Sequence, residues 1–215
     1  MKKKFNFFNF YLLSALGTVA VVFNSYAQSS TSDNGVVING VKWATRNVDK
    51  PGTFAAKPED AGMFYQWNRK IGWSTTDPMK NSNGGTTWDA TVPTGTAWEK
   101  VNDPSPTGWR VPTYKEQQTL FDTDKVSNGW TTQNGITGRK FTEKATGNSI
   151  FLPAVGGRHG SDGTLGLVGL NGLYWSSTAG ESDETYAVNL TFLSDYVYWY
   201  AGSRSYGFLV RAVAE

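Results

Sequence analysis

The clearest alternation of apolar and polar positions along the chain lies near its C-terminus, in residues 172–213. Side chains of an extended strand point alternately to its two faces, so strict alternation predicts a strand with one buried face. The apolar face holds Val188, Leu190 and Phe192, and the opposite face holds Asn189, Thr191 and Leu193. A turn near Ser194 and Asp195 is then predicted to reverse the chain.

Tyrosines dominate the segment after this turn. Tyr196, Tyr198 and Tyr200 share one face of the predicted strand, opposite Val197 and Trp199. Tyrosine suits a binding surface because it offers a large contact area at a small cost in rotamer entropy. The same residues also suit ordinary packing across neighbouring strands. The spacing alone leaves both interpretations open, and it predicts a set of antiparallel strands in either case.

Two helices are predicted in the first half of the chain. Residues 57–70 begin with Pro58 and two acidic residues, as helices often do, and Phe64, Trp67 and Ile71 have the spacing of one helix face. The second predicted helix runs to about residue 122. It follows Thr113 and Glu116, which have the spacing of a capping box.

Short strands and long loops account for the rest. Asn39-Gly40 predicts a hairpin within residues 36–48, and Asn134-Gly135 predicts a weaker one within residues 126–141. A buried strand is expected at 149–155, and loops at 75–107 and 156–171. Trp88 and Trp98 are expected to attach the first loop to the body. These elements predict an α+β fold with two early helices, antiparallel strands and long loops.

The first 27 residues have the layout of a secretory signal peptide. A basic start and a short apolar run are followed by Ser25-Tyr26-Ala27. We therefore expect a signal peptide at 1–27, a linker at 28–35 and one domain at 36–215. The mature protein is expected to be exported, and so secreted, periplasmic or at the cell surface, with membrane contact only by association.

Composition limits the chemistry. Cleavage of the predicted leader removes three lysines, which leaves 20 − 3 = 17 basic residues against 18 acidic ones. The net charge of the mature chain is therefore about −1, which argues against a nucleic-acid partner. The chain has no cysteine, and His159 is its single histidine, expected in an exposed loop. We therefore predict no metal site, no cofactor, no catalytic residue and no enzymatic activity.

Five motifs in chain order resemble the Fibrobacter succinogenes major paralogous domain family, found in exported proteins of Bacteroidetes-type bacteria. They are GVKWATRNV (40–48), DPSPTGWRVPT (103–113), IFLPAVGGR (150–158), LYWSST (173–178) and YGFLVRAV (206–213). The resemblance implies a C-type-lectin-like fold related to the formylglycine-generating enzymes. Those enzymes depend on cysteines, which this chain lacks. The calcium-dependent sugar-binding motifs of C-type lectins are also missing.

The tail is similar to the variable region of proteins diversified by bacterial retroelements. Randomising the adenines of AAC codons cannot produce Lys, Glu, Gln or Met, and residues 185–214 contain none of these. Strands also disfavour several of these residue types, so the pattern has an ordinary explanation as well. The resemblance implies nine ligand-binding positions: Thr191, Leu193, Tyr196, Tyr198, Tyr200, Ala201, Gly202, Ser203 and Tyr206.

The predicted function is therefore a recognition module with a variable C-terminal surface. Its expected partner is a protein or glycan ligand at a cell or phage surface, bound without metal. Arg204 and Arg211 are expected to fix the scaffold rather than to bind ligand. A structural or adhesin-type surface subunit is the alternative, and an enzyme of the formylglycine-generating type is a weaker one.

Overall fold

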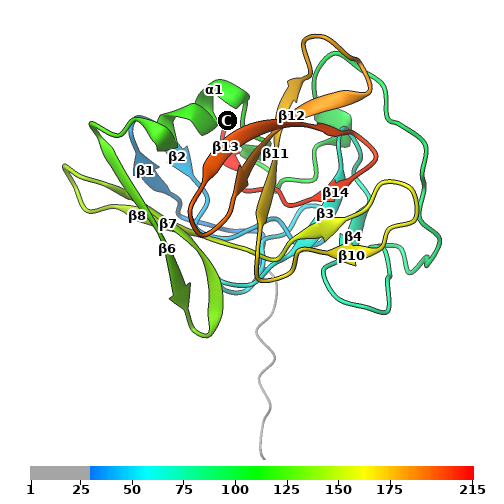
Figure 1. Ribbon diagram of the computed structural model, residues 1–215, viewed down its shortest axis with the longest axis horizontal. Coiled ribbons are helices and arrows are strands. Elements are labelled where there is room, and N and C mark those ends of the chain that lie inside the picture. The colour runs from blue at the N-terminus through cyan, green and yellow to red at the C-terminus, as the bar shows by residue number, and fades with distance from the viewer. Residues whose placement is uncertain (1–29) are drawn as a thin grey trace, which may run out of the picture.

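The computed structural model describes residues 30–215, and the predicted signal peptide at 1–27 lies outside this part of the chain (Figure 1). The described chain is mostly β, with 39% of its residues in strands and 6% in helices. The predicted α+β class with two early helices is therefore wrong. The C-type-lectin-like architecture implied by the family resemblance is not supported by this mostly β fold.

Antiparallel strands form four sheets within residues 30–215. The first has the order β1 (Val36–Ile38), β2 (Val41–Trp43), β15 (Val213–Ala214) and β5 (Trp109–Arg110). The second has the order β10 (Leu165–Gly166), β9 (Gly157–Arg158), β14 (Gly207–Phe208), β3 (Met63–Gln66) and β4 (Gly72–Ser74). The third is β11 (Gly172–Ala179), β12 (Tyr186–Phe192) and β13 (Val197–Ser203), and the fourth is β6 (Val126–Gln133), β7 (Ile136–Glu143) and β8 (Ser149–Pro153).

Both predicted hairpins are confirmed. Asn39 and Gly40 have φ angles of 47° and 80°, and they connect β1 to β2. Asn134 and Gly135, with φ angles of 48° and 84°, connect β6 to β7. Asn and Gly tolerate positive φ at both central positions of a tight hairpin turn, which explains why these dipeptides identified the hairpins. The second hairpin is longer than predicted, with eight residues in each strand.

The helix predicted at 57–70 is wrong, because this segment contains strand β3, which lies between β14 and β4 in the second sheet. All four residues of β3 are buried. Phe64 packs in one hydrophobic cluster, whereas Met63 and Tyr65 pack in a second cluster. A strand between two cores is apolar on both faces, so its pattern resembles a short buried helix. Ile71, which the helical spacing placed in the core, is 42% exposed.

The capping box of the second predicted helix is confirmed, but the helix is short. Glu116 N–H donates to Thr113 Oγ1 at 3.2 Å, and Thr113 N–H donates to Glu116 Oε2 at 2.7 Å. The helix α1 (Tyr114–Gln118) continues as a 3₁₀ turn, η2 (Thr119–Phe121). Another 3₁₀ turn, η1 (Lys100–Asn102), lies in the long loop. One α-helix therefore occurs in the described chain, where two were expected.

Indole groups attach the long loop to the body, as predicted. Trp88 and Trp98 are 9% and 8% exposed. Trp88 Nε1 donates to the carbonyl of Gly160 at 3.0 Å. Trp98 Nε1 donates to that of Asn102 within the loop at 2.9 Å, and the Trp98 ring contacts the Trp67 ring of the body with centroids 6.0 Å apart. Each ring thus buries apolar surface while its polar edge bonds a backbone carbonyl. The loop is therefore ordered without forming strands along most of its length.

Arg211 lies in the interior, consistent with its predicted scaffold role. Its guanidinium donates to Asn47 Oδ1 at 2.9 Å, to the Ala44 carbonyl at 3.2 Å and to the Phe151 carbonyl at 2.9 Å. Burial lowers the pKa of Arg211 to about 10, so the group stays charged at neutral pH. It connects the segment that follows β2 to β8, two parts of the chain that are far apart in sequence.

We expect Arg211→Lys to lower the free energy of unfolding by about 3 kcal/mol, because lysine cannot reach three acceptors from one planar group and leaves buried carbonyls unpaired. Urea denaturation at pH 7 measures this change. The control is Arg69→Lys, since Arg69 pairs with the half-exposed Asp89 and its loss is expected to cost less than about 1 kcal/mol. Equal losses in both variants would contradict a scaffold role for Arg211.

The fold is expected to lose stability at low pH because of Asp33, whose side chain is 1% exposed. Burial alone would raise the pKa of this carboxyl, but hydrogen bonds from Gly35, Thr45 and Arg46 outweigh it and the pKa is lowered. A lowered folded-state pKa adds stability above the unfolded-state pKa, and this contribution is lost as the pH falls through the folded-state pKa.

Asp33→Asn is therefore expected to be less stable than the unmodified protein at pH 7. The difference should shrink as the pH falls below about 4, the ordinary pKa of aspartate. Chemical denaturation of both proteins between pH 7 and pH 3 tests this. Asp124→Asn, at an exposed carboxylate, is the control. A stability gap that is constant across this range would be the opposite result.

Candidate functional site

The β11–β12–β13 sheet has two faces with different roles. One face lies on the core, where Leu190 and Phe192 are buried and Trp199 contacts the Tyr114 and Phe121 rings at centroid distances of 5.4 and 4.7 Å. The other face pairs Asn189 with Tyr200 and Thr191 with Tyr198. The period-two assignment of Leu190, Phe192 and Trp199 to the core side is therefore confirmed.

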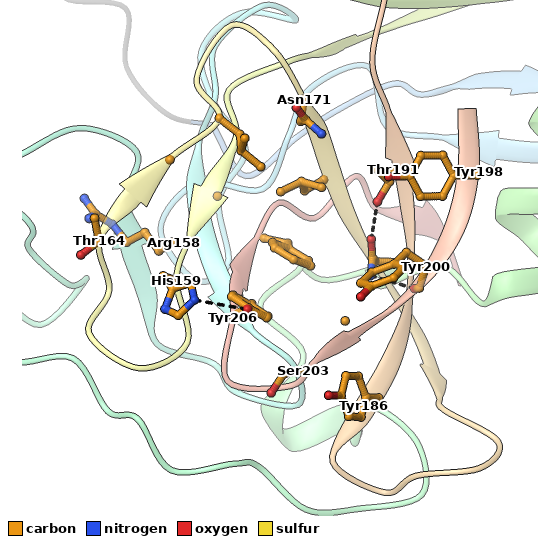
Figure 2. A pocket seen from close by; sticks show the side chains of 17 residues that line it. Arg158, His159, Thr164, Asn171, Tyr186, Thr191, Tyr198, Tyr200, Ser203 and Tyr206 are labelled. Atoms are coloured by element: carbon orange, nitrogen blue, oxygen red, sulfur yellow. Dashed lines mark hydrogen bonds between the residues drawn. The ribbon is translucent and has the colours of Figure 1, made fainter. Parts of the chain in front are cut away.

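A groove lies over this second face. It is bounded on one side by the tyrosines of β13 and on the other by β9, β10 and the loop between them, as Figure 2 shows for Tyr198 and Tyr200 opposite His159 and Tyr206. Its volume is about 430 Å³, which is within the range of roughly 300–1,000 Å³ typical of ligand pockets. The aromatic rings of Tyr206 and Phe208, which both line the groove, stack with centroids 5.7 Å apart.

The structure brings together six of the nine predicted ligand-binding residues around the groove. These six are Thr191, Tyr198, Tyr200, Gly202, Ser203 and Tyr206. The other three lie outside it: Leu193 and Tyr196 flank the β12–β13 turn, and Ala201 points to the opposite face of β13. Tyr196, Tyr198 and Tyr200 are 69%, 42% and 57% exposed, whereas Thr191 and Gly202 are buried.

The floor of the groove is polar and fixed by internal hydrogen bonds. Asn189 is completely buried, and its Nδ2 donates to the Tyr200 carbonyl at 2.8 Å. Thr191 Oγ1 donates to Asn189 Oδ1 at 2.8 Å. Gly202 lies beside this pair, and a Cβ at this position would be 2.9 Å from Asn189 Nδ2. Substitutions at these floor residues are therefore expected to disturb the packing, and the floor serves to position β13.

His159 and Arg158 were not predicted as site residues, yet both line the groove. The His159 Nε2 is 3.3 Å from the Tyr206 hydroxyl, and its Nδ1 is 2.9 Å from Ser161 Oγ. The ring is exposed, as the sequence suggested. No local pattern connects His159 to the tail, because the two meet through the pairing of β9 with β14.

The two buried arginines near the groove are occupied by the protein itself. Arg158 donates to the carbonyls of Ser74, Thr76 and Gly163 at 2.7–2.8 Å, and it pairs with Asp77 at 3.1 Å.

Arg204 donates to the carbonyls of Tyr186 and Gly95 at 3.0 and 2.9 Å, and it lies 4.1 Å from the centre of the Trp67 ring. Burial lowers the pKa of Arg204. These contacts agree with the scaffold role predicted for Arg204. Together with those of Arg158, they leave the groove without a free positive charge among its lining residues.

Residues 30–215 contain no group of three or more His, Asp or Glu side chains arranged to hold a metal ion. In the same part of the chain, no helix is both long enough and apolar enough to cross a membrane. The expectations of no cofactor and no catalytic residue stay predictions.

Comparison with known families identifies the larger group to which the chain is related. The model of the Lcl C-terminal domain matches residues 59–214, which is most of the sequence. The chain belongs to this family. The match includes four of the five motifs quoted above and leaves out the first, at 40–48. Comparisons with curated proteins and with solved structures return no match.

The shape of the groove floor leads to a prediction about Gly202. We expect Gly202→Ala to lower the free energy of unfolding by about 1–3 kcal/mol, because the added methyl group approaches Asn189 and, at 3.1 Å, the Phe208 ring. The neighbouring exposed change Ala201→Ser should stay within about 0.5 kcal/mol of the unmodified protein. Thermal and urea unfolding measure both, and an unchanged Gly202→Ala protein would show that the floor can relax.

Proposed function

We propose that this protein is an exported, non-catalytic recognition module that binds a protein or glycan ligand in the groove over β12 and β13. The proposal rests on one observation, which is that residues from separate parts of the chain come together around a single groove. Six residues chosen from a pattern in the sequence line one concave surface, together with His159 from another part of the chain. The predicted leader at 1–27 supports export.

The composition of the groove supports binding over chemistry. Tyr186, Tyr198, Tyr200 and Tyr206 offer flat apolar rings with a hydroxyl at the end, which suit contact with a protein side chain or with the apolar face of a sugar. His159 and Ser203 add hydrogen-bonding groups at the rim. Arg158 is the one strong cation in the lining, and Asp77 and backbone carbonyls already occupy it.

We further propose that a retroelement diversifies part of this surface. Tyr196, Tyr198, Tyr200 and Ala201 are exposed, so changes there remove little buried area. Leu193, Ser203 and Tyr206 are partly exposed. Thr191 and Gly202 are buried in the groove floor, so the proposal now treats these two positions as fixed.

A display library tests the capacity to vary. Randomising Tyr196, Tyr198, Tyr200 and Ala201 is expected to leave most clones folded, because all four side chains are exposed. Randomising Leu190 and Phe192, which are at most 1% exposed, is expected to unfold most clones. Protease resistance on the display surface measures the folded fraction. A first library as protease-sensitive as the second would contradict the proposal.

The gene tests the diversification mechanism itself. Codons at the seven proposed variable positions should end in C or T. A near-copy of the segment, with adenine at those codons, should lie beside a reverse transcriptase gene. Mixed third bases together with no such copy would leave a recognition module whose surface does not vary.

Ligand binding requires its own measurement. We expect a neutral glycan array and a peptide array to reveal a ligand whose affinity falls at least about tenfold in Tyr200→Ala, the loss expected when a central aromatic contact is removed. Val37→Ala is the matched control, because Val37 is 46% exposed and lies on β1 in a different sheet. Equal binding by both variants would place the ligand elsewhere.

A further inference from the structure

Strand β13 is the last strand of its sheet. The order is β11, β12 and β13, and β13 pairs only with β12. The pairing runs without interruption through seven residue pairs, from Tyr186 with Ser203 to Phe192 with Val197. The outer side of β13 therefore carries no strand, and the strand is regular enough to accept one.

The hydrogen-bond pattern shows which backbone groups face outward. Leu193 N–H donates to the Tyr196 carbonyl at 2.8 Å, so these two residues form a hydrogen-bonded pair. Such pairs alternate along an antiparallel ladder, so Tyr198, Tyr200 and Gly202 also point their backbone groups toward β12. Val197, Trp199 and Ala201 consequently point theirs to the open side. None of the backbone hydrogen bonds found outside the strands in residues 30–215 involves these three residues.

This edge lacks the features that usually prevent pairing with another chain. Natural edge strands are commonly protected by proline, by lysine, by a bulge or by a covering segment. The sequence of β13 is VYWYAGS, which contains none of these residues, and its ladder has no bulge. Tyr198, Tyr200 and Ala201 are exposed. The edge is therefore uncharged, aromatic and open.

We propose that two copies of this protein pair through β13, antiparallel and about a two-fold axis at Trp199. Val197, Trp199 and Ala201 of each copy would exchange backbone hydrogen bonds with Ala201, Trp199 and Val197 of the other. This interface does not require the groove to bind a ligand, so it goes beyond the function proposed above.

The sequence is complementary to itself in this register. Tyr198 meets Tyr200 of the second copy, an aromatic cross-strand pair that stabilises sheets. Tyr196 meets Gly202, so the largest exposed ring lies opposite a residue without a side chain. Asp195, the single acidic side chain between Leu193 and Ser203, meets the hydroxyl of Ser203 and no second acid. A second copy therefore fits this edge without opposed like charges, which favours it over an unrelated partner.

The pairing joins two three-stranded sheets into one continuous sheet. A two-fold axis perpendicular to a sheet keeps equivalent faces on the same side, so both grooves would open in one direction. Two linked sites that face one multivalent surface bind more tightly than either site alone. The dimer would thus present a pair of recognition grooves to a cell surface.

Sedimentation equilibrium over a range of protein concentrations tests the assembly, with a dimer as the expected result. Ala201→Pro removes one outward N–H from each copy and should raise the dissociation constant of the dimer at least about tenfold, since the bonded pairs on both sides of the central Trp199 pair each lose a hydrogen bond. Proline is tolerated on an edge strand, so the monomer should keep its fold. Ala201→Ser keeps the N–H and should remain dimeric. A monomer at all concentrations, or a dimer insensitive to Ala201→Pro, would overturn the proposal.

Cysteine pairing tests the register, because the chain has no cysteine of its own. Tyr198→Cys alone and Tyr200→Cys alone place their thiols diagonally across the interface, too far apart for a disulfide. When the two variants are mixed and oxidised, position 198 of one copy faces position 200 of the other. A cross-linked species in the mixture but in neither single variant is the expected result. Equal cross-linking in all three samples, or none in the mixture, would overturn this register.

Discussion

Buried guanidinium groups hold together the parts of this fold that no sheet connects. Arg158, Arg204 and Arg211 are each 1% exposed, and each donates to backbone carbonyls of at least two separate segments. A chain with long loops has many carbonyls that lack a strand partner, and leaving them unpaired in the interior is costly. A planar group with several donors satisfies them at once, so the loops can be buried without becoming regular structure.

The same constraint explains how the groove is built. Its two walls come from β9–β10 and from β12–β13, which are separated in sequence and belong to different sheets. Arg158 fixes the first wall to the end of β4 and to Thr76 just after it, and Arg204 fixes the start of β12 to the long loop at Gly95. Trp175 Nε1 donates to the Tyr65 carbonyl at 2.7 Å, which connects the sheet beneath the groove to β3. The shape of the groove is thus maintained by contacts in the interior. Because the rim residues do not have to maintain this shape, they can be polar and exposed.

Short sequence motifs predicted turns and the helix start correctly. Sequence patterns failed where contacts between distant segments determine the secondary structure or the position of a residue. Asn-Gly dipeptides identified both hairpins, and the capping box identified α1, because each signal concerns a few adjacent residues. Strand β3 was mistaken for a helix because both of its faces are buried, which removes the alternation that identifies a strand. Period two separated the two faces of β12 and β13 correctly. It could not show that Thr191 and Gly202 lie in the floor of a groove, nor that His159 lies beside Tyr206, since those facts depend on contacts between distant segments.

The hydrogen bond from Asn189 to the Tyr200 carbonyl has a consequence for how this surface can evolve. The acceptor belongs to the main chain, so the bond persists whatever side chain residue 200 carries. The neighbouring ladder bonds of β12 with β13 have the same property. The path of the strand therefore does not depend on the exposed side chains of Tyr198 and Tyr200, whereas Trp199 and Gly202 still help to position the strand. Asn189 of β12 thus helps to set the backbone geometry of β13, while the exposed side chains of β13 set the chemistry of the surface. Those exposed side chains can change while β12 stays the same.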